Sequence, residues 1–112
     1  MEGGRSELIA GTLELLILKT LSMGVLHGYG IARNIQTLSS DALRVEEGSL
    51  YPALQRLHAQ GFVSPEWKRS PTGRQARYYR LTASGRRQLG LEESTFLDSV
   101  AAIKRVLRRA ES

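Results

Sequence analysis

The sequence of 112 residues contains no cysteine. This absence excludes a disulfide scaffold, a cysteine zinc site and thiol catalysis, and it is compatible with the reducing cytoplasm. Only two histidines are present, His27 and His58, whereas a structural zinc site normally uses four cysteine or histidine ligands. We therefore expect neither a metal ion nor a cofactor.

Long apolar runs and a secretion signal are also missing. The apolar run from Leu15 to Leu18 is far shorter than the roughly 20 residues that a membrane-spanning helix needs. The first residues, MEGGRSEL, lack the basic start and the apolar stretch of a signal peptide. The sequence thus predicts a cytoplasmic protein without membrane contact.

Catalytic motifs are absent from the sequence as well. There is no Gly-x-Ser-x-Gly elbow, and no pattern brings serine, histidine and aspartate together. The stretch Gly28-Tyr29-Gly30 is only a fragment of a phosphate-binding loop, because it lacks the lysine partner and the preceding strand. We expect that the protein is not an enzyme.

The basic residues are concentrated in the second half of the chain. Sixteen Lys and Arg against eleven Asp and Glu give a net charge of +5, with −1 on residues 1–59 and +6 on residues 60–112. Between Lys68 and Arg87 there are seven basic residues and no acidic one. A localised basic segment on a folded chain indicates a polyanionic partner. The alternative is a solvated face that only keeps the protein soluble.

Apolar periodicity predicts a first helix over about residues 8–22. Its apolar residues spread around more than one face: Leu13, Leu15, Leu16, Ile17, Leu18 and Leu21. Such a helix must be covered on several sides, and a second subunit could supply part of that cover. A turn is predicted from Met23 to Gly28, and a second helix from Gly28 to about Ser39.

A third helix is predicted between Glu47 and Gly61. Pro52 lacks an amide hydrogen and is best placed in the first turn, which puts the helix start between Glu47 and Ser49, with Ser49 as a candidate cap. Gly61 is a natural C-terminal stop. The buried stripe consists of Leu50, Ala53, Leu54 and Leu57. The opposite face is small or hydrogen-bonding with one charge: Gly48, Ser49, Pro52, Gln55, Arg56 and Ala59, with Tyr51 on its flank.

The period then changes from helical to alternating. Residues 62–67 and 77–82 are rich in β-forming side chains and predict two strands. Pro65 indicates an edge position for the first strand. Residues 69–75, which include proline and glycine, predict a basic loop between the strands. This segment is therefore expected to be a two-stranded hairpin with a cationic tip.

Three aromatic residues lie in the predicted hairpin. Trp67 is expected to pack at the base of the hairpin rather than to stack on bases. Tyr78 and Tyr79 must point to opposite sides of their strand, so one of them belongs to the core.

A long helix is predicted from Thr82, its cap, to the C-terminus, with an interruption near Gly90. Its apolar seam consists of Leu89, Phe96, Val100, Ile103 and Leu107. No later residues of the sequence can cover this seam, so we expect it to bind a second copy of the chain. Leu13 and Leu16 of the first helix are expected to join the same dimer interface.

Three helices followed by a hairpin with a cationic tip is the order of a winged helix-turn-helix. The sequence therefore predicts a mainly α fold with a small β-hairpin, of the α+β class. Residues 1–82 form the winged-helix DNA-binding domain in this prediction, and residues 83–112 form the C-terminal dimerisation helix. The third helix is expected in the major groove of duplex DNA, with the hairpin on the backbone or in the minor groove.

Two alternatives remain open. An RNA-binding winged helix needs exposed aromatics for stacking on single-stranded bases, whereas most of the seven aromatics lie at predicted core positions. A winged-helix module that only binds other proteins does not need an acid-free basic hairpin.

Four stretches of the sequence also resemble PadR-type transcriptional regulators. They are GTLELLILKTL (residues 11–21), HGYGIAR (27–33), EGSLYPALQRL (47–57) and GRQARYYRLT (73–82). The resemblance extends over about residues 11–107. It implies a bacterial cytoplasmic repressor that binds a pseudo-palindromic operator as a homodimer through its C-terminal helix. It also implies the compact branch of the family, which has no separate effector domain.

The resemblance and the residues together define the expected sites. The resemblance implies that Ser49, Tyr51, Pro52 and Gln55 lie at DNA and that Arg74 lies on the wing. The full expected DNA-contact set is Tyr29, Arg33, Ser49, Tyr51, Pro52, Gln55, Arg56, Lys68, Arg69, Thr72, Arg74 and Arg77.

An effector pocket is also implied by the resemblance. In some compact members an aromatic residue on the C-terminal helix lines a pocket between subunits and stacks on planar ligands. Phe96, with Val100 beside it, has the comparable place, although the better-known residue there is Trp. A planar hydrophobic small molecule is thus a candidate effector, and the alternative is that Phe96 only fills the dimer interface.

Overall fold

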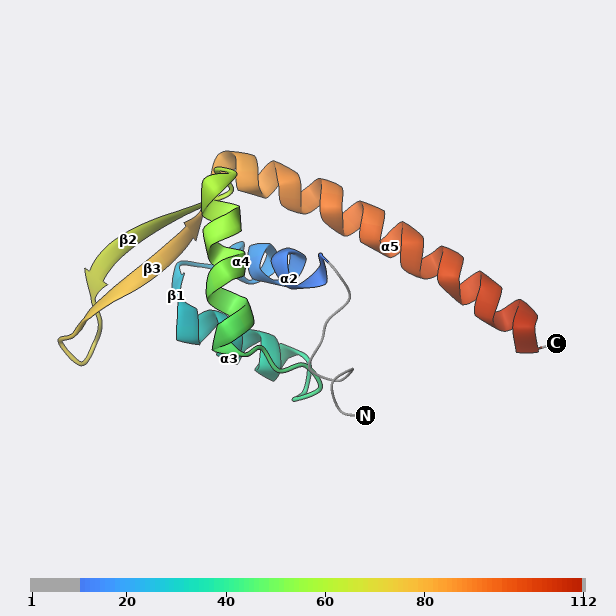
Figure 1. The fold of residues 1–112 in the computed structure, drawn as a ribbon, viewed down its shortest axis with the longest axis horizontal. Coiled ribbons are helices and arrows are strands. Elements are labelled where there is room, and N and C mark those ends of the chain that lie inside the picture. Colours follow the sequence, from blue (N-terminus) through green and yellow to red (C-terminus); the bar gives the residue numbers. More distant parts are fainter. Residues whose placement is uncertain (1–10, 112) are drawn as a thin grey trace.

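The structure, a computed structural model, describes residues 11–111. Its elements follow one another as α2 (Thr12–Leu21), β1 (Leu26–His27), α3 (Gly28–Leu38), α4 (Glu47–Ala59), β2 (Val63–Arg69), β3 (Gln75–Leu81) and α5 (Ala83–Glu111). Helices α2, α3 and α4 lie together beside the small sheet, the β2–β3 hairpin projects from one side, and α5 extends as a long arm from the other (Figure 1). The predicted mainly helical fold with a small β-structure is confirmed.

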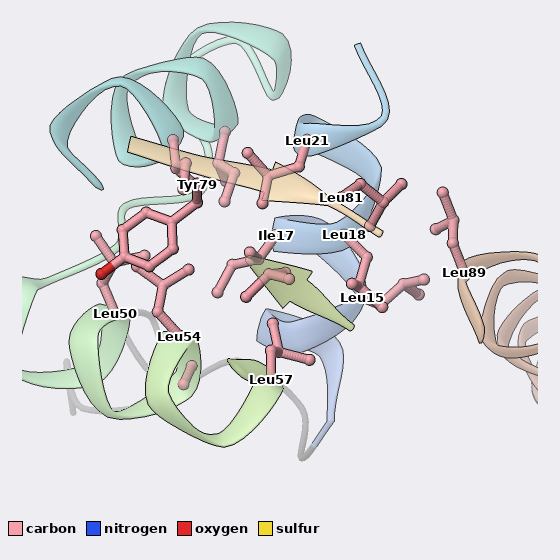
Figure 2. Close-up of a cluster of buried hydrophobic side chains, with 14 residues drawn as sticks. Leu15, Ile17, Leu18, Leu21, Leu50, Leu54, Leu57, Tyr79, Leu81 and Leu89 are labelled. Atoms are coloured by element: carbon pink, nitrogen blue, oxygen red, sulfur yellow. The ribbon is translucent and has the colours of Figure 1, made fainter. Parts of the chain in front are cut away.

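Helix α2 lies at the centre of the core and contacts α3, α4, α5 and β3 (Figure 2). Its buried apolar residues are Leu15, Ile17, Leu18 and Leu21. Most of the cover for its wide apolar surface therefore comes from the same chain, while Leu13 and Leu16 remain half-buried. The helix begins after Gly11, whose φ of 84° is left-handed. The predicted residues 8–10 lie outside the described residues.

The sheet has three strands, in the order β1-β3-β2, whereas the sequence predicted only a hairpin. Strand β1 pairs with the middle of β3, with Leu26 opposite Tyr79 and His27 opposite Tyr78. The predicted turn from Met23 to Gly28 is thus wrong at its end. A strand of two residues is too short to show the alternating pattern by which strands are predicted. Its partners also lie about fifty positions later in the chain.

The hairpin is longer than predicted, because β2 continues to Arg69 and β3 begins at Gln75, opposite it. The tight turn between them is closed by Ser70 N–H, which donates to the Arg74 carbonyl at 2.6 Å. Strand β2 is at an edge of the sheet, as Pro65 indicated. Trp67 does not pack at the base of the hairpin. Its side chain is 65% exposed.

Helix α4 begins as predicted at Glu47, but its N-cap is Glu46 and not Ser49. Ser49 is the third residue of the helix, and its amide donates to the Glu46 carbonyl at 3.0 Å. Pro52 is consequently in the second turn, beyond the position at which a missing amide hydrogen costs nothing. The stop at Gly61 is confirmed by its φ of 81°, which favours glycine.

Helix α5 is capped as predicted, since Thr82 Oγ1 accepts a hydrogen bond from the Gly85 amide at 3.0 Å. The predicted interruption near Gly90 is wrong, because the helix is continuous to Glu111. A single glycine costs a helix only about 1 kcal/mol relative to alanine. Leu89 belongs to the chain's own core at 6% exposure, so it has little surface left for a second copy (Figure 2).

The start of α5 is fixed against Phe62, between α4 and β2, by a close backbone contact at Gly85. A Cβ at this position would lie 2.0 Å from the Phe62 carbonyl oxygen, whereas a Cβ at Gly90 would meet nothing within 4 Å. Gly85→Ala should therefore lower the free energy of unfolding by about 1–3 kcal/mol through overpacking. Gly90→Ala is the matched control and should raise it by up to about 1 kcal/mol.

Urea unfolding of both variants at one protein concentration measures this difference. Equal stability of the two variants would show that Gly85 is not a point of close contact.

Candidate nucleic-acid interface

The exposed face of α4 carries the residues predicted to contact bases. Ser49, Tyr51, Pro52 and Gln55 are all exposed, while the apolar stripe Leu50, Ala53, Leu54 and Leu57 is buried against the rest of the chain. The exposed side chains offer hydroxyl and amide groups. Such groups can donate and accept hydrogen bonds at the edges of bases in the major groove.

Arg56 is held by helix α2 and does not extend freely from α4. Its Nε and Nη2 atoms donate to Oε2 of Glu14 at 2.9 and 2.7 Å. The Arg56 side chain keeps 58% of its surface exposed and that of Glu14 only 21%. The pair connects α4 to α2 and occupies two donors that a phosphate or a guanine would otherwise take. The role of Glu14 could not be predicted, because 42 positions separate it from Arg56.

Tyr51 lies against the start of α3. A Cβ on Gly28 would stand 2.5 Å from the Tyr51 hydroxyl oxygen, so only glycine permits this contact. Burial, with smaller contributions from Glu47 and Tyr79, raises the pKa of Tyr51 above its ordinary value of 10.0. The hydroxyl group therefore remains protonated at neutral pH and can act as a hydrogen-bond donor.

Tyr29 and Arg33 on α3 are brought beside this tyrosine. Both residues line the shallow hollow between α3 and α4 that Tyr51 also lines. Arg33 Nη1 donates to the Tyr29 hydroxyl oxygen at 3.0 Å. The start of α3 is fixed by His27, whose Nδ1 atom accepts a hydrogen bond from the Gly30 amide at 2.9 Å. The predicted α3 and α4 residues thus form one surface.

The remaining predicted contacts lie on the hairpin. Lys68, Arg69, Thr72, Arg74 and Arg77 are all exposed. The acidic residue of the hairpin, Glu66, lies toward its base and contacts Arg80, with Nη2 3.9 Å from Oε1. The tip of the hairpin is therefore positively charged. A projecting cationic hairpin is suited to the phosphate backbone and to the minor groove.

A second candidate site is a hollow of about 490 Å³ between α2 and α5. Phe96 and Val100, the predicted effector residues, both line it, together with Leu15, Leu91 and Ile103. The Glu92 carboxylate is also in its wall and accepts a hydrogen bond from Gln88 Nε2 at 2.6 Å. The hollow is thus mainly apolar with one acidic group.

The predicted dimer residues fall into three groups by their exposure in a single chain. Leu89 is buried, as described above. Leu13, Leu16, Phe96 and Val100 are half-buried, and the first three pack against the core. Ile103 and Leu107 are 55% and 58% exposed. Further exposed apolar side chains on α5, outside the predicted dimer set, are Leu91, Leu97 and Val106.

Two further observations concern residues 11–111. No group of three or more His, Asp or Glu side chains in this range could hold a metal ion. No helix in the same range is long and apolar enough to cross a membrane.

The three helices, the antiparallel sheet and the basic wing define a winged helix-turn-helix protein of the transcriptional regulator class. The family model for the transcriptional regulator PadR-like family matches residues 17–91, and the chain belongs to this family. The predicted resemblance and fold class are thus confirmed. This family, and the PadR-like structures that the chain resembles, are those of transcriptional regulators.

Similar proteins agree with this assignment. A protein named transcriptional regulator Rv3488 from Mycobacterium tuberculosis is 42% identical over 66 residues, which are 59% of this chain and 60% of that protein. A PadR-like transcription factor from Bacteroides fragilis has a structure with a TM-score of 0.70 at 30% identity, covering 86% of this chain and 90% of the other. A PadR-like regulator from Bacillus cereus has a TM-score of 0.74 at 27% identity, covering 87% and 92%.

Proposed function

We propose that this protein is a transcriptional repressor that binds a pseudo-palindromic operator in duplex DNA as a homodimer. The observation that carries the proposal is the exposed face of α4, uncharged and hydrogen-bonding at Ser49, Tyr51 and Gln55, beside an acid-free hairpin tip. The helix face has the chemistry of base contacts. The hairpin tip has the chemistry of phosphate contacts.

The two parts of the interface serve different purposes in this proposal. Gln55 presents an amide that can form two hydrogen bonds with one base, which provides sequence preference. Arg74 presents a charge at the hairpin turn, which provides affinity for any duplex by releasing counterions. Arg56 contributes less than its position on α4 suggests, because Glu14 holds it.

The first test compares Gln55→Ala with Arg74→Ala on the promoter of the chain's own gene, with the site defined by footprinting. Gln55→Ala should reduce the preference for this site over a scrambled duplex by about 1–3 kcal/mol. Arg74→Ala should weaken binding to both duplexes and lower the salt slope by about 0.9. In transcription from that promoter in vitro, added protein should lower the transcript yield.

Two outcomes would contradict the proposal. Equal affinity of the wild type for promoter and scrambled duplexes across a salt series would exclude a sequence-specific regulator. A rise in transcript yield would exclude a repressor.

Dimerisation through α5 is the second part of the proposal. Its support is the part of the apolar seam that one chain leaves exposed: Ile103 at 55% and Leu107 at 58%. Each large apolar side chain that a partner buries contributes roughly 1.5–3 kcal/mol. Two copies related by a two-fold axis would also present two α4 helices to the two halves of a palindrome.

Ile103→Glu tests this interface, because it places a charge in the seam without touching the buried core. We expect a loss of dimer in light scattering and a large loss of operator affinity. Ala101→Glu is the matched control, since it adds the same charge to an exposed residue on the other side of α5. A dimeric Ile103→Glu variant would show that the seam is not the interface.

The third part of the proposal is that the hollow between α2 and α5 admits a planar hydrophobic effector. Phe96 and Val100 supply an apolar surface, and Glu92 favours a ligand with a positive charge. Such a ligand would bias the arrangement of α5, to which the DNA-binding elements are joined.

Titration with a planar cationic dye tests the hollow. Phe96→Ala and Glu92→Gln should each weaken dye binding, the first through lost apolar contact and the second through lost charge. Asp98→Asn removes the same charge from α5 outside the hollow and should leave binding unchanged. Undiminished binding to Phe96→Ala would remove Phe96 from the site.

A further inference from the structure

The β2–β3 hairpin has two chemically different faces. Tyr79 and Leu81 of β3 point into the core, where Tyr79 lies beside Leu50 and Leu54 of α4 (Figure 2). Because side chains alternate along a strand and directly paired residues share a face, the same face continues outward along both strands. We call this continuation the inner wing face. It consists of Trp67, which is paired with Arg77, and Arg69, which is paired with Gln75.

The opposite side, the outer wing face, consists of Glu66, Lys68, Ala76, Tyr78 and Arg80. Its cations already have partners within the chain. Lys68 Nζ lies 4.9 Å from the centre of the Tyr78 ring, and Arg80 Nη2 lies 3.9 Å from Glu66 Oε1. On the outer wing face, an acidic side chain and an aromatic ring thus lie beside the two positive charges. These partners weaken the attraction of the two charges to a polyanion.

The inner wing face differs in both charge and exposure. Its two arginines, Arg69 and Arg77, have no acidic side chain on the same face of the hairpin, within the residues that the structure describes. Arg69 Nη1 donates to the Gly73 carbonyl at 3.1 Å, and Arg77 Cζ lies 5.8 Å from the centre of the Tyr79 ring. Neither contact places an acidic group beside these charges, so both remain available to a polyanion. Beside these charges lies Trp67, which leaves 65% of its surface in water. An exposed indole offers a partner a large, rigid apolar surface with one N–H donor.

We propose that the inner wing face is the part of the wing that contacts DNA, with Trp67 packed against the sugars of the backbone and with Arg69 and Arg77 on phosphates. The inner wing face is on the α4 side of the sheet, so one duplex can meet it and the exposed face of α4 together. Lys68 lies on the outer wing face and contributes little to DNA binding in this proposal. This inference deepens the proposed function and rests on it.

Intrinsic fluorescence gives a direct test, because Trp67 is the only tryptophan in the chain. Titration of the full chain with its operator duplex should change Trp67 emission in parallel with binding, measured separately by the anisotropy of labelled DNA. Trp67→Ala should weaken operator binding about tenfold, as expected from losing a partly buried aromatic contact. Its salt slope should not change, because no charge is removed.

A pair of charge variants distinguishes the two faces. Arg77→Gln removes a charge from the inner wing face and should lower the salt slope by about 0.9. Arg80→Gln removes a charge from the outer wing face of the same strand and should leave the slope unchanged. Circular-dichroism melting curves of all variants identify any that are unfolded, and Trp67→Phe, which retains an aromatic side chain, should keep most of the affinity.

The outcomes separate this inference from the proposed function. If the wild type binds the operator but Trp67 emission stays constant and both arginine variants have equal slopes, the inner wing face is wrong and the proposed function stands. If the wild type binds no duplex, both are wrong. Tighter binding to single strands than to duplex, with Trp67 quenched, would instead assign Trp67 to stacking on bases and overturn the inference.

Discussion

Burial of helix α2 is the interaction on which the rest of the structure depends. Within Thr12–Leu21, only Lys19 is exposed, and even this residue contacts α5, with Nζ 3.4 Å from Glu93 Oε1. A chain of this length cannot build separate cores for its helices and its sheet. One helix that is apolar on most of its surface solves the problem, because α3, α4, α5 and β3 all pack against it.

This arrangement fixes the candidate interface. Tyr79 connects the sheet to α4 through Leu50 and Leu54, and β1 connects the start of α3 to the same strand (Figure 2). The side chains that would meet DNA therefore project from helices and strands whose relative positions are set by the core. Polar contacts such as the one between Arg56 and Glu14 then adjust which of these side chains remain available.

The fold could be predicted from the sequence where a pattern is long and local. The stripe of α4, the glycine at position 61 and the alternation around Tyr78 and Tyr79 each depend on neighbours within a few residues, and these predictions agree with the structure. The predictions that were wrong depend on contacts between distant residues. Strand β1 exists only because β3 lies beside it, and Leu89 is buried only because α5 starts against the core.

The candidate site shows the same difference between local patterns, which could be predicted, and contacts between distant residues, which could not. The residues of the α4 face were found from their spacing, and their exposure agrees with that prediction. Which groups already have a partner could not be predicted, because Glu14 reaches Arg56 from another helix. The exposure of Trp67 also escaped prediction, since an aromatic residue in a strand is compatible with either face until the register of the sheet is known.

The continuity of α5 has a mechanical consequence. With 29 residues and no break, the helix is a rod about 44 Å long, and its first turns are anchored by Gly85 and Leu89. One end of this rod is held in the core. A small change of tilt imposed on its far half therefore rotates α2 to β3 together, as one rigid unit, and does not change the packing within that unit.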